Sequence, residues 1–316
     1  MARKKVSVSI VNYNGKRFLG DCLTSLRQQD YPDIEVVLVD NASTDGSASF
    51  VAENFPEVRV IVNDENCFFC RGQNIGIRNT SGEYVLALNN DVVLGRSFVS
   101  GMVTAIETDP GIGSVSGRIL RTGGDVVDTT GLFMGRDRRP LDRGYGMPYT
   151  GQFAEEGYIF GAGGVAPLYR REMLDDVALE GEYFDETYEA YYEDLDLAWR
   201  AQIRGWKAYY TPDAVAWHVR GGTAKTERPP FGFMGQSAFA QISGPLKARL
   251  LRNRYLTILK DDRPVDFLLN LPFILLYDIK VWTFVLFFSP GSIPLFIRGM
   301  RALPAAWRHR KLIHGH

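Results

Sequence analysis

Short apolar runs alternate with segments of helical spacing over the first third of the chain. Val6–Val11 and Ile34–Val39 are apolar, rich in β-branched residues and of strand length. Between them, apolar residues recur on one helical face, at Phe18, Leu19, Cys22, Leu23 and Leu26. A strand, a helix and a second strand at this distance predict a βαβ unit with parallel strands.

The alternation then continues with further helical and strand-like segments, at Ser47–Asn54, Val58–Val62, Gln73–Arg78, Tyr84–Leu88 and Phe98–Ile106. This order predicts an α/β fold with an open, mostly parallel sheet and flanking helices. Ligands of such sheets bind beyond the carboxyl ends of the strands. The chemistry is therefore expected just after Val11, Val39, Leu88 and Trp217.

The regular pattern is lost in the middle of the chain. Residues 121–157 are dominated by Gly, Arg and Asp. Long irregular stretches in compact domains are functional lids or disordered, and we expect one of these here. Regular signals return at Gly164–Tyr169, in the helix-like Leu195–Ile203, and in the strand-like Lys207–Tyr210 and Val215–Trp217.

The last third of the chain has a different composition. Residues 265–297 are rich in Leu, Ile, Phe and Trp, but Asp278 and Lys280 interrupt one candidate for a membrane span of about 20 residues. Pro290, Gly291 and Pro294 break the other. We therefore expect segments that lie in the membrane interface, with a buried helical subdomain or a dimer face as alternatives. A basic tail suited to an anionic leaflet follows, with Arg298, Arg301, Arg308, His309, Arg310 and Lys311.

Composition excludes some classes of protein. The chain has 316 residues with 36 Lys and Arg against 37 Asp and Glu, so its net charge of -1 does not favour nucleic acid as a partner. Three cysteines suit a reducing compartment, and no apolar leader follows the basic start, so we expect a cytoplasmic location. Cys67-Phe68-Phe69-Cys70 has no second pair to complete a zinc site, and we interpret it as incidental.

Short polar side chains follow three of the predicted strands. Asp40 comes directly after one of them, where a carboxylate can accept an N–H of a pyrimidine ring or a ribose hydroxyl. The following Ser43-Thr44-Asp45 fits helix capping equally well. Asp91 ends Asn89-Asn90-Asp91 after a buried strand. One carboxylate with diphosphate oxygens and water is a typical setting for Mg²⁺ or Mn²⁺, although a turn aspartate is the simpler interpretation.

With these motifs the chain resembles the family 2 glycosyltransferases of the GT-A fold, in particular the branch of bacterial rhamnosyltransferases and related cell-surface polysaccharide enzymes. The resemblance spans roughly residues 6–223. The segments that carry it occur in the family's order, at Val8–Asn14, Asp40–Ser47, Arg71–Gly76, Leu88–Asp91, Phe160–Arg171, Glu193–Arg200 and Trp217-His218.

The resemblance implies where the donor and metal bind. Asp40 would contact the base of the nucleotide, and the other residues expected at the donor are Asn12, Asn14, Asn41, Arg71, Asn74 and Asn90. Asp91 stands as the last acidic residue of the family's metal-binding Asp-x-Asp motif, of which this chain keeps one carboxylate. His218 would supply a second ligand to Mg²⁺ or Mn²⁺.

The resemblance also implies the catalytic group. Glu193-Asp194 opens a predicted helix, and the family places its general base at the Asp of this pair. The acceptor hydroxyl must lose a proton as it attacks the anomeric carbon, and a positioned carboxylate can take it. In the alternative interpretation, Glu193 and Asp194 only favour the helix N-terminus through its dipole. Asp196 and Arg200 fit a structural i, i+4 pair, and Tyr188, Tyr191 and Tyr192 fit either the acceptor site or the core.

The sequence therefore predicts an inverting glycosyltransferase with a GT-A domain over residues 1–225 and a helical, apolar extension over 226–316, membrane-associated or dimerising. The donor is expected to be dTDP-rhamnose, with a UDP-sugar second, and the acceptor a lipid-linked glycan at the cytoplasmic face of a bacterial inner membrane. Two rivals stay open. One is a sugar-phosphate nucleotidyltransferase, and the other is a degenerate domain that acts as a binding or assembly subunit.

Overall fold

The computed structural model describes residues 4–220, 239 and 242–315. The chain forms two compact units. One contains Met1–Phe133 and Asp142–Gly221, and the other contains Met134–Leu141 and Gly222–His316. The boundary expected at residues 225 and 226 lies outside the described residues.

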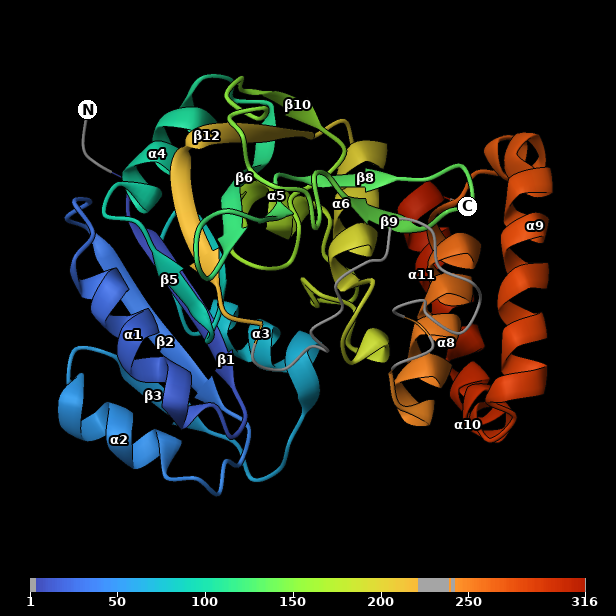
Figure 1. Cartoon of the computed structure of the whole chain (residues 1–316), viewed down its shortest axis with the longest axis horizontal. Helices are drawn as coiled ribbons and strands as arrows, with labels where there is room; N and C mark the ends of the chain where they lie inside the picture. The colour runs from blue at the N-terminus through green and yellow to red at the C-terminus, as the bar shows by residue number, and fades with distance from the viewer. Residues whose placement is uncertain (1–3, 221–238, 240–241, 316) are drawn as a thin grey trace. The chain divides into compact units, whose positions relative to one another are not determined.

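The first unit is built on a mixed sheet with strand order β10-β12-β6-β11-β4-β1-β2-β3, which Figure 1 shows from β3 to β12. β1, β2, β3 and β4 are mutually parallel, and β12 is parallel to β6, whereas β11 runs antiparallel to both β4 and β6. The carboxyl ends of β1, β2, β4, β6 and β12 therefore share one edge of the sheet. The bounds are β1 Val6–Asn12, β2 Ile34–Asp40, β3 Arg59–Val62, β4 Tyr84–Asn89, β6 Ile112–Arg121, β11 Leu168–Arg170 and β12 Lys207–His218.

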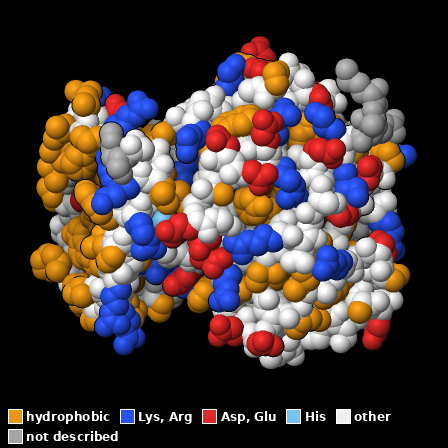
Figure 2. Space-filling view, turned by 180° about the vertical axis from the view of Figure 1, so that it is seen from behind, with side chains coloured by type: hydrophobic (Ala, Val, Ile, Leu, Met, Phe, Trp, Pro, Cys, Tyr) orange, Lys and Arg blue, Asp and Glu red, His pale blue; other side chains and the backbone are white. Residues whose placement is uncertain are grey.

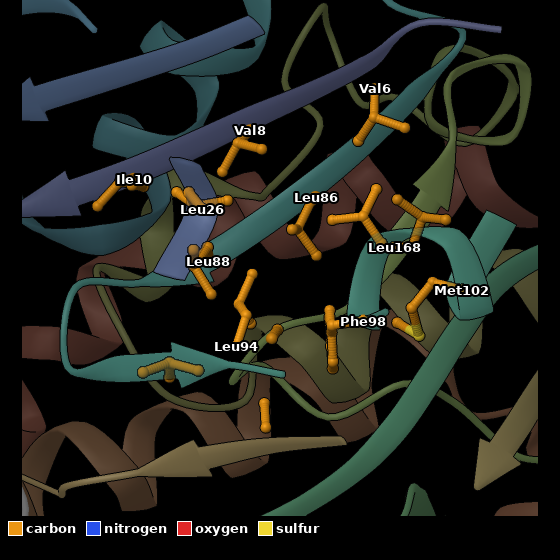
Figure 3. Close-up of a cluster of buried hydrophobic side chains, with 14 of the residues drawn as sticks. Val6, Val8, Ile10, Leu26, Leu86, Leu88, Leu94, Phe98, Met102 and Leu168 are labelled. Atoms are coloured by element: carbon orange, nitrogen blue, oxygen red, sulfur yellow. The ribbon is translucent and has the colours of Figure 1, made fainter. Parts of the chain in front are cut away.

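Apolar side chains on one face of the sheet form the main core with the helices above it (Figure 3). Val8 and Ile10 of β1 pack there with Leu26 and Phe98, which come from the helices α1 and α4. The opposite face of β1 carries Ser9, and α3 lies close to it. The helices of this unit are α1 Lys16–Arg27, α2 Ser47–Asn54, α3 Phe68–Arg78, α4 Phe98–Glu107, α5 Arg171–Asp176 and α6 Glu193–Ile203, with the 3-10 turn η1 Glu186–Tyr188.

The region predicted to be irregular, residues 121–157, contains regular structure instead. Its strands are β7 Val127–Thr129, β8 Leu132–Met134 and β9 Pro140–Asp142, and β10 Gly157–Ile159 follows at its end. β7 pairs with β6, β8 with β9, and β10 with β12. Three residues are too few to show a hydrophobic period, which explains why the sequence pattern did not reveal these strands and why the expectation of disorder was wrong.

One long strand replaces the two expected at Lys207–Tyr210 and Val215–Trp217. β12 runs from Lys207 to His218 and shifts register against β6 between Tyr210 and Val215. Pro212 and Asp213 lie in this interval. Both residue types are depleted in strands, so the sequence pattern breaks where the strand only bulges.

The second unit is helical. Its helices are α8 Gly244–Asp261, α9 Pro264–Phe288, α10 Ser292–Gly299 and α11 Leu303–His314, with the 3-10 turn η3 Met300–Ala302. The hairpin tip, residues 134–141, belongs to this unit. Its Arg138 forms a buried two-pronged ion pair with Asp262, with Nε 2.7 Å from Oδ2 and Nη2 3.0 Å from Oδ1.

α9 forms a single helix of 25 residues over the apolar segment that contains Asp278 and Lys280. Arg254 of α8 pairs with Asp278, Nε to Oδ1 at 3.0 Å. Among the described helices, α9 is the one long and apolar enough to cross a membrane, by length and composition alone. The basic tail is partly internal: His309 is buried, and Arg310 donates to the carbonyls of Leu259 and Asp262.

Candidate active site

A buried chain of polar side chains joins the ends of β1, β2 and β4. Asn12 donates from Nδ2 to Oδ2 of Asp40 at 2.8 Å, and Asn90 donates from Nδ2 to Oδ1 of Asn12 at 2.7 Å. The other oxygen of Asp40 accepts the backbone N–H of Ser43 at 2.8 Å. Asp40 and Asn12 are almost fully buried, whereas Asn90 is half-buried. The strand-end residues predicted from the sequence are therefore brought together by hydrogen bonds.

Gly15, just after β1, leaves room for this chain of side chains. A Cβ at residue 15 would lie 2.5 Å from Oδ1 of Asn12 and nearer still to Nδ2 of Asn90. We expect Gly15→Ala to separate Asn12 from Asn90 and to lower the free energy of unfolding by about 1–3 kcal/mol through overpacking. Thermal unfolding measures this loss. Gly157→Ala is the matched control, because nothing lies within 4 Å of its added Cβ, and equal effects of the two would contradict the account.

Two further predicted donor residues differ in their exposure to solvent. Asn14 is exposed, has a φ of 50°, and accepts the backbone N–H of Thr44 on Oδ1 at 2.8 Å. Asn41 is buried and holds the loop before α3, because it donates to the carbonyl of Phe68 at 3.0 Å. Its oxygen accepts from Asn63 at 2.8 Å and from the Cys67 thiol at 3.0 Å.

Two residues of the predicted donor loop lie on α3, and only one of them is exposed to solvent. Arg71 is 56% exposed at its side chain and lies 3.9 Å from Glu186. Asn74 is fully buried and makes four hydrogen bonds, to Phe184 O, to Glu186 Oε1, and from the backbone N–H groups of Tyr183 and Phe184. Asn74 therefore ties α3 to the 183–186 segment, and Arg71 has the side chain that reaches solvent.

Asp91 and His218 meet at the same edge of the sheet. β5 (Val92–Leu94) begins directly after Asp91 and pairs antiparallel with β12, with Val92 opposite His218. This register brings Nε2 of His218 to 3.2 Å from Oδ1 of Asp91. Both side chains are nearly buried, at 8% exposure for Asp91 and 7% for His218.

Asp128 of β7 orients His218 and was not identified from the sequence. Its Oδ2 lies 2.7 Å from Nδ1 of His218, and its Oδ1 accepts from Nε of Arg220. Burial alone would lower the pKa of His218, but its hydrogen bonds with Asp128 and Asp91 raise that pKa to about 9. Because Nδ1 is held by Asp128, Nε2 is the ring nitrogen that faces Asp91.

This arrangement fits two neighbouring ligands of a divalent metal. Ligand distances of about 2.1 Å at right angles place two octahedral ligands about 3 Å apart, close to the separation of Oδ1 and Nε2. A carboxylate on the far nitrogen of a metal-binding histidine is a common second partner. Among the described residues, no group of three or more His, Cys, Asp or Glu that could hold a metal is found.

The first turn of α6 carries the predicted catalytic acids. Asp194 is half-buried, and its oxygens accept the backbone N–H groups of Gly164 at 3.1 Å and Leu195 at 2.8 Å. Burial raises the pKa of Asp194 despite these hydrogen bonds. Glu193 is buried, and burial together with the charge of Asp194 raises its pKa. Oε2 of Glu193 has no hydrogen-bond partner among the described residues.

The backbone before α6 is strained, and the helix behind it is rigidly anchored. Glu189, Tyr191 and Tyr192 all have positive φ, between 62° and 72°. Such conformations cost about 1–3 kcal/mol each and cluster at functional sites. Asp196 and Arg200 form the buried ion pair predicted from their spacing, at 2.9 Å. Of the three tyrosines before α6, Tyr188 is buried, and Tyr191 and Tyr192 are half-buried.

A mostly parallel, mixed sheet with this strand order, flanked by helices, is the GT-A glycosyltransferase fold. Two solved structures are similar over nearly the whole chain. A mannosyltransferase from Pyrobaculum calidifontis in complex with GDP-Man and Mn²⁺ has a TM-score of 0.56 and 21% identity, covering 97% of this chain and 76% of that one. TarS residues 1–349 of S. aureus in complex with UDP has a TM-score of 0.57 and 17% identity, covering 98% and 86%.

The sequence model for glycosyl transferase family 2 matches residues 7–178, more than half of the chain. The chain belongs to this family. A poly-β-1,6-N-acetyl-D-glucosamine synthase of Staphylococcus epidermidis is 24% identical over 217 residues, or 67% of this chain, which spans about half (49%) of that relative. An N-acetylglucosaminyl-diphospho-decaprenol L-rhamnosyltransferase of Mycobacterium tuberculosis is 27% identical over 242 residues, covering 67% of this chain and 75% of that protein.

Proposed function

We propose that this protein transfers one sugar from a nucleoside diphosphate sugar to an acceptor hydroxyl with inversion at the anomeric carbon. The observation that carries the proposal is the Asp91–His218 pair at the carboxyl edge of the sheet, together with Asp194, which accepts a backbone N–H from the loop that joins this edge. Asn89 N donates to Val165 O at 3.0 Å where the loop joins the edge, next to the glycine that donates to Asp194. Asp91 and His218 stand 3.2 Å apart, and the carboxylate of Asp194 is fixed by backbone N–H groups at the start of α6. Asp91 and His218 suit a metal that binds the diphosphate of the donor, and Asp194 suits proton removal from the acceptor.

The donor is dTDP-rhamnose, with a UDP-sugar as the second choice. The similarity to an L-rhamnosyltransferase over 75% of that protein supports the first, and the similarity to the N-acetylglucosamine polymer synthase supports the second. Asp40 faces the base, held in place by Asn12 and Ser43. Arg71 is the exposed cation of the predicted donor loop and is suited to a phosphate.

Asp91 and His218 would hold Mg²⁺ or Mn²⁺, which neutralises charge on the departing nucleoside diphosphate. Asp128 keeps Nε2 of His218 directed at Asp91. Asp194 accepts the proton of the acceptor hydroxyl while the acceptor oxygen bonds to the anomeric carbon. The bond between that carbon and the phosphate oxygen breaks on the opposite face, which inverts the configuration.

We place the acceptor on a lipid-linked glycan at the cytoplasmic face of a bacterial inner membrane, with the helical unit as a peripheral contact. Figure 2 shows hydrophobic side chains gathered over this unit, with Lys and Arg side chains beside them. Leu276 and Phe287 of α9 are 71% and 76% exposed. Arg298, Arg301, Arg308 and Lys311 are exposed basic residues of the same unit. Apolar bulk with nearby cations supports binding to an anionic membrane surface.

Replacing Leu276 and Phe287 together by Glu is expected to weaken binding to phosphatidylglycerol-containing vesicles by at least about tenfold, because each side chain contributes about 1.5–3 kcal/mol when it leaves water. Vesicle flotation of the full chain measures this loss. Tyr158→Glu, at a 59% exposed aromatic residue of the first unit, is the control. If the wild-type protein is a dimer that does not bind vesicles, and the double variant is monomeric, this face is instead a homodimer interface.

The leaving group tests the reaction class. The full chain is incubated with Mn²⁺ and dTDP-rhamnose, UDP-N-acetylglucosamine or GDP-mannose, each with a membrane lipid extract as acceptor, and the products are separated by mass. Release of a nucleoside diphosphate with a labelled lipid is the expected result. Release of inorganic diphosphate in the presence of a nucleoside triphosphate and sugar phosphate would identify a nucleotidyltransferase, and no turnover of any donor would favour a binding subunit.

A further inference from the structure

Asp142 lies beside the proposed base, although it comes from a different part of the chain. Asp142 ends β9, in the region that the sequence pattern left without structure. A Cβ added to Gly163 would lie 3.3 Å from Oδ1 of Asp142, and one added to the next residue, Gly164, would lie 3.4 Å from Oδ2 of Asp194. The two carboxylates therefore rest against consecutive glycines of one loop.

The side chain of Asp142 is open to solvent, yet it sits in a crowded and acidic setting. The surrounding protein and the charge of Asp194 raise the pKa of Asp142 to about 7, against the lowering effect of a hydrogen bond with Thr129. At neutral pH the carboxyl of Asp142 therefore both accepts and donates hydrogen bonds.

The fold itself does not require this carboxyl. The backbone around it is fixed by main-chain bonds, from Arg143 N to Gly131 O at 2.9 Å and from Thr130 N to Arg143 O at 3.1 Å. Asp142 forms no ion pair with the residues that the structure describes. Gly163 and Gly164 carry no side chain that would cover the two carboxylates. An exposed acid beside a catalytic base, with an open backbone between them, is arranged to meet a ligand.

We infer that Asp142 binds the acceptor, holding hydroxyl groups of its terminal sugar so that the reacting hydroxyl faces Asp194. This inference rests on the proposed function and adds the residue that positions the acceptor. Asp142 takes no part in the bond changes, since the proton passes to Asp194. Hydroxyl groups are the partners that suit it, because a carboxylate accepts from two neighbouring hydroxyls and the neutral acid donates to one.

The same carboxyls define the chemical class of the acceptor sugar. Asp142 and Asp194 bring two carboxyls to one glycine loop, close enough that the charge of Asp194 raises the pKa of Asp142 against the opposite effect of Arg220. A uronic acid or a phosphate on the accepting ring would bring like charge to this place, and like charges in a poorly solvated site repel strongly. The accepting ring is therefore an uncharged sugar, and any phosphate of a lipid carrier lies beyond it.

The test compares Asp142→Ala and Asp142→Asn with wild type in the full chain. The acceptors are octyl glycosides of glucose, N-acetylglucosamine, galactose and rhamnose, together with octyl glucuronide and the membrane lipid extract. Loss of a hydrogen bond to a charged group corresponds to about a ten- to hundredfold effect. We expect Asp142→Ala to raise the acceptor KM by that factor with the donor KM unchanged, and Asp142→Asn, which keeps hydrogen-bonding atoms, to recover part of it.

Asp125→Ala, at an exposed aspartate of the same region, is the matched control and should match wild type. An unchanged acceptor KM in Asp142→Ala would overturn the inference, as would a fall in melting temperature that accounts for the lost activity. Octyl glucuronide accepted as well as the neutral glycosides, or no neutral glycoside accepted, would overturn the acceptor class. If wild type releases no nucleoside diphosphate from any donor, the proposed function itself fails, which is a distinct result.

Discussion

Asp194→Asn is expected to reduce kcat for sugar transfer by about 10²–10⁴, the usual contribution of a positioned general base. The amide keeps the size and a hydrogen-bond acceptor for the backbone N–H groups of Gly164 and Leu195. It has no basic site for the proton of the acceptor hydroxyl. Binding of the nucleotide donor should be unchanged, because Asp194 lies on α6 and not on the strand-end network around Asp40. Steady-state kinetics with both substrates varied measures this difference.

The pH dependence gives a second view of the same residue. A base must be ionised, so activity rises as the pH passes upward through its pKa. Burial raises the pKa of Asp194. We therefore expect the acid limb of the pH profile of kcat to have an apparent pKa above the usual aspartate value of about 3.9. Glu193→Gln is the comparison: burial and the charge of Asp194 raise the pKa of Glu193, so Glu193 is already neutral where Asp194 titrates, and this limb should stay in place while transfer continues. Full activity in Asp194→Asn would show that another group takes the proton.

Asp128→Asn should weaken Mn²⁺ binding by about 10- to 100-fold, the usual effect of losing the outer partner of a metal-binding histidine. The substitution removes the carboxylate that holds Nδ1 of His218 at 2.7 Å and that accepts from Arg220. His218 is then free to turn its Nε2 away from Asp91. Titration of the protein with Mn²⁺, followed by calorimetry in the presence of a nucleoside diphosphate, measures the loss.

Asp125→Asn again serves as the control, since Asp125 is exposed and lies three residues away in sequence. Asp128 is fully buried, so a loss of stability is expected as well, and the melting temperature of each variant without metal corrects for it. Unchanged Mn²⁺ affinity in a folded Asp128→Asn protein would mean that His218 does not bind the metal.

The fold was predictable wherever elements are long enough to show a period. The runs that became β1, β2 and β4 and the helical face that became α1 were all visible, because each repeats its pattern over six residues or more. The shorter elements depend on tertiary contacts that the local sequence does not show. β7, β8 and β9 have three residues each and are defined by their neighbours. Asp278 within α9 is paired by Arg254 of another helix, a partner that the local sequence does not reveal.

The candidate site was predictable to the extent that it lies at strand ends. The rule that parallel strands place their carboxyl ends at one edge pointed to the positions of Asp40, Asp91 and His218, whereas the role of His218 as a metal ligand came from the family resemblance. Asp128 and Asp142 were missed because they belong to the short strands, and Asp128 meets His218 across 90 positions of sequence. The local signal for Asp128 was an acid between Val127 and Thr129, two residue types enriched in strands.

Other predicted donor residues illustrate what a sequence leaves open. Asn41 and Asn74 occur in the motifs from which the donor pocket was inferred, but their amides hold neighbouring loops in place. A short polar side chain at a strand end or helix start is equally suited to binding a ligand and to holding a neighbouring loop by hydrogen bonds. Asp45 shows the bracing role clearly: it accepts the backbone N–H groups of Lys16 and Ser47, at the starts of α1 and α2.

The central claim is that Asp91 and His218 form a metal-dependent site for a nucleoside diphosphate. The most direct test is the melting temperature of the full chain with UDP, dTDP or GDP, each with and without Mn²⁺, in wild type and Asp91→Asn. A ligand that binds only the folded state raises the melting temperature by mass action. We expect one pyrimidine diphosphate to stabilise wild type with Mn²⁺ and to lose most of this effect without metal or in Asp91→Asn. No stabilisation by any nucleotide, or equal stabilisation in the variant, would contradict the account.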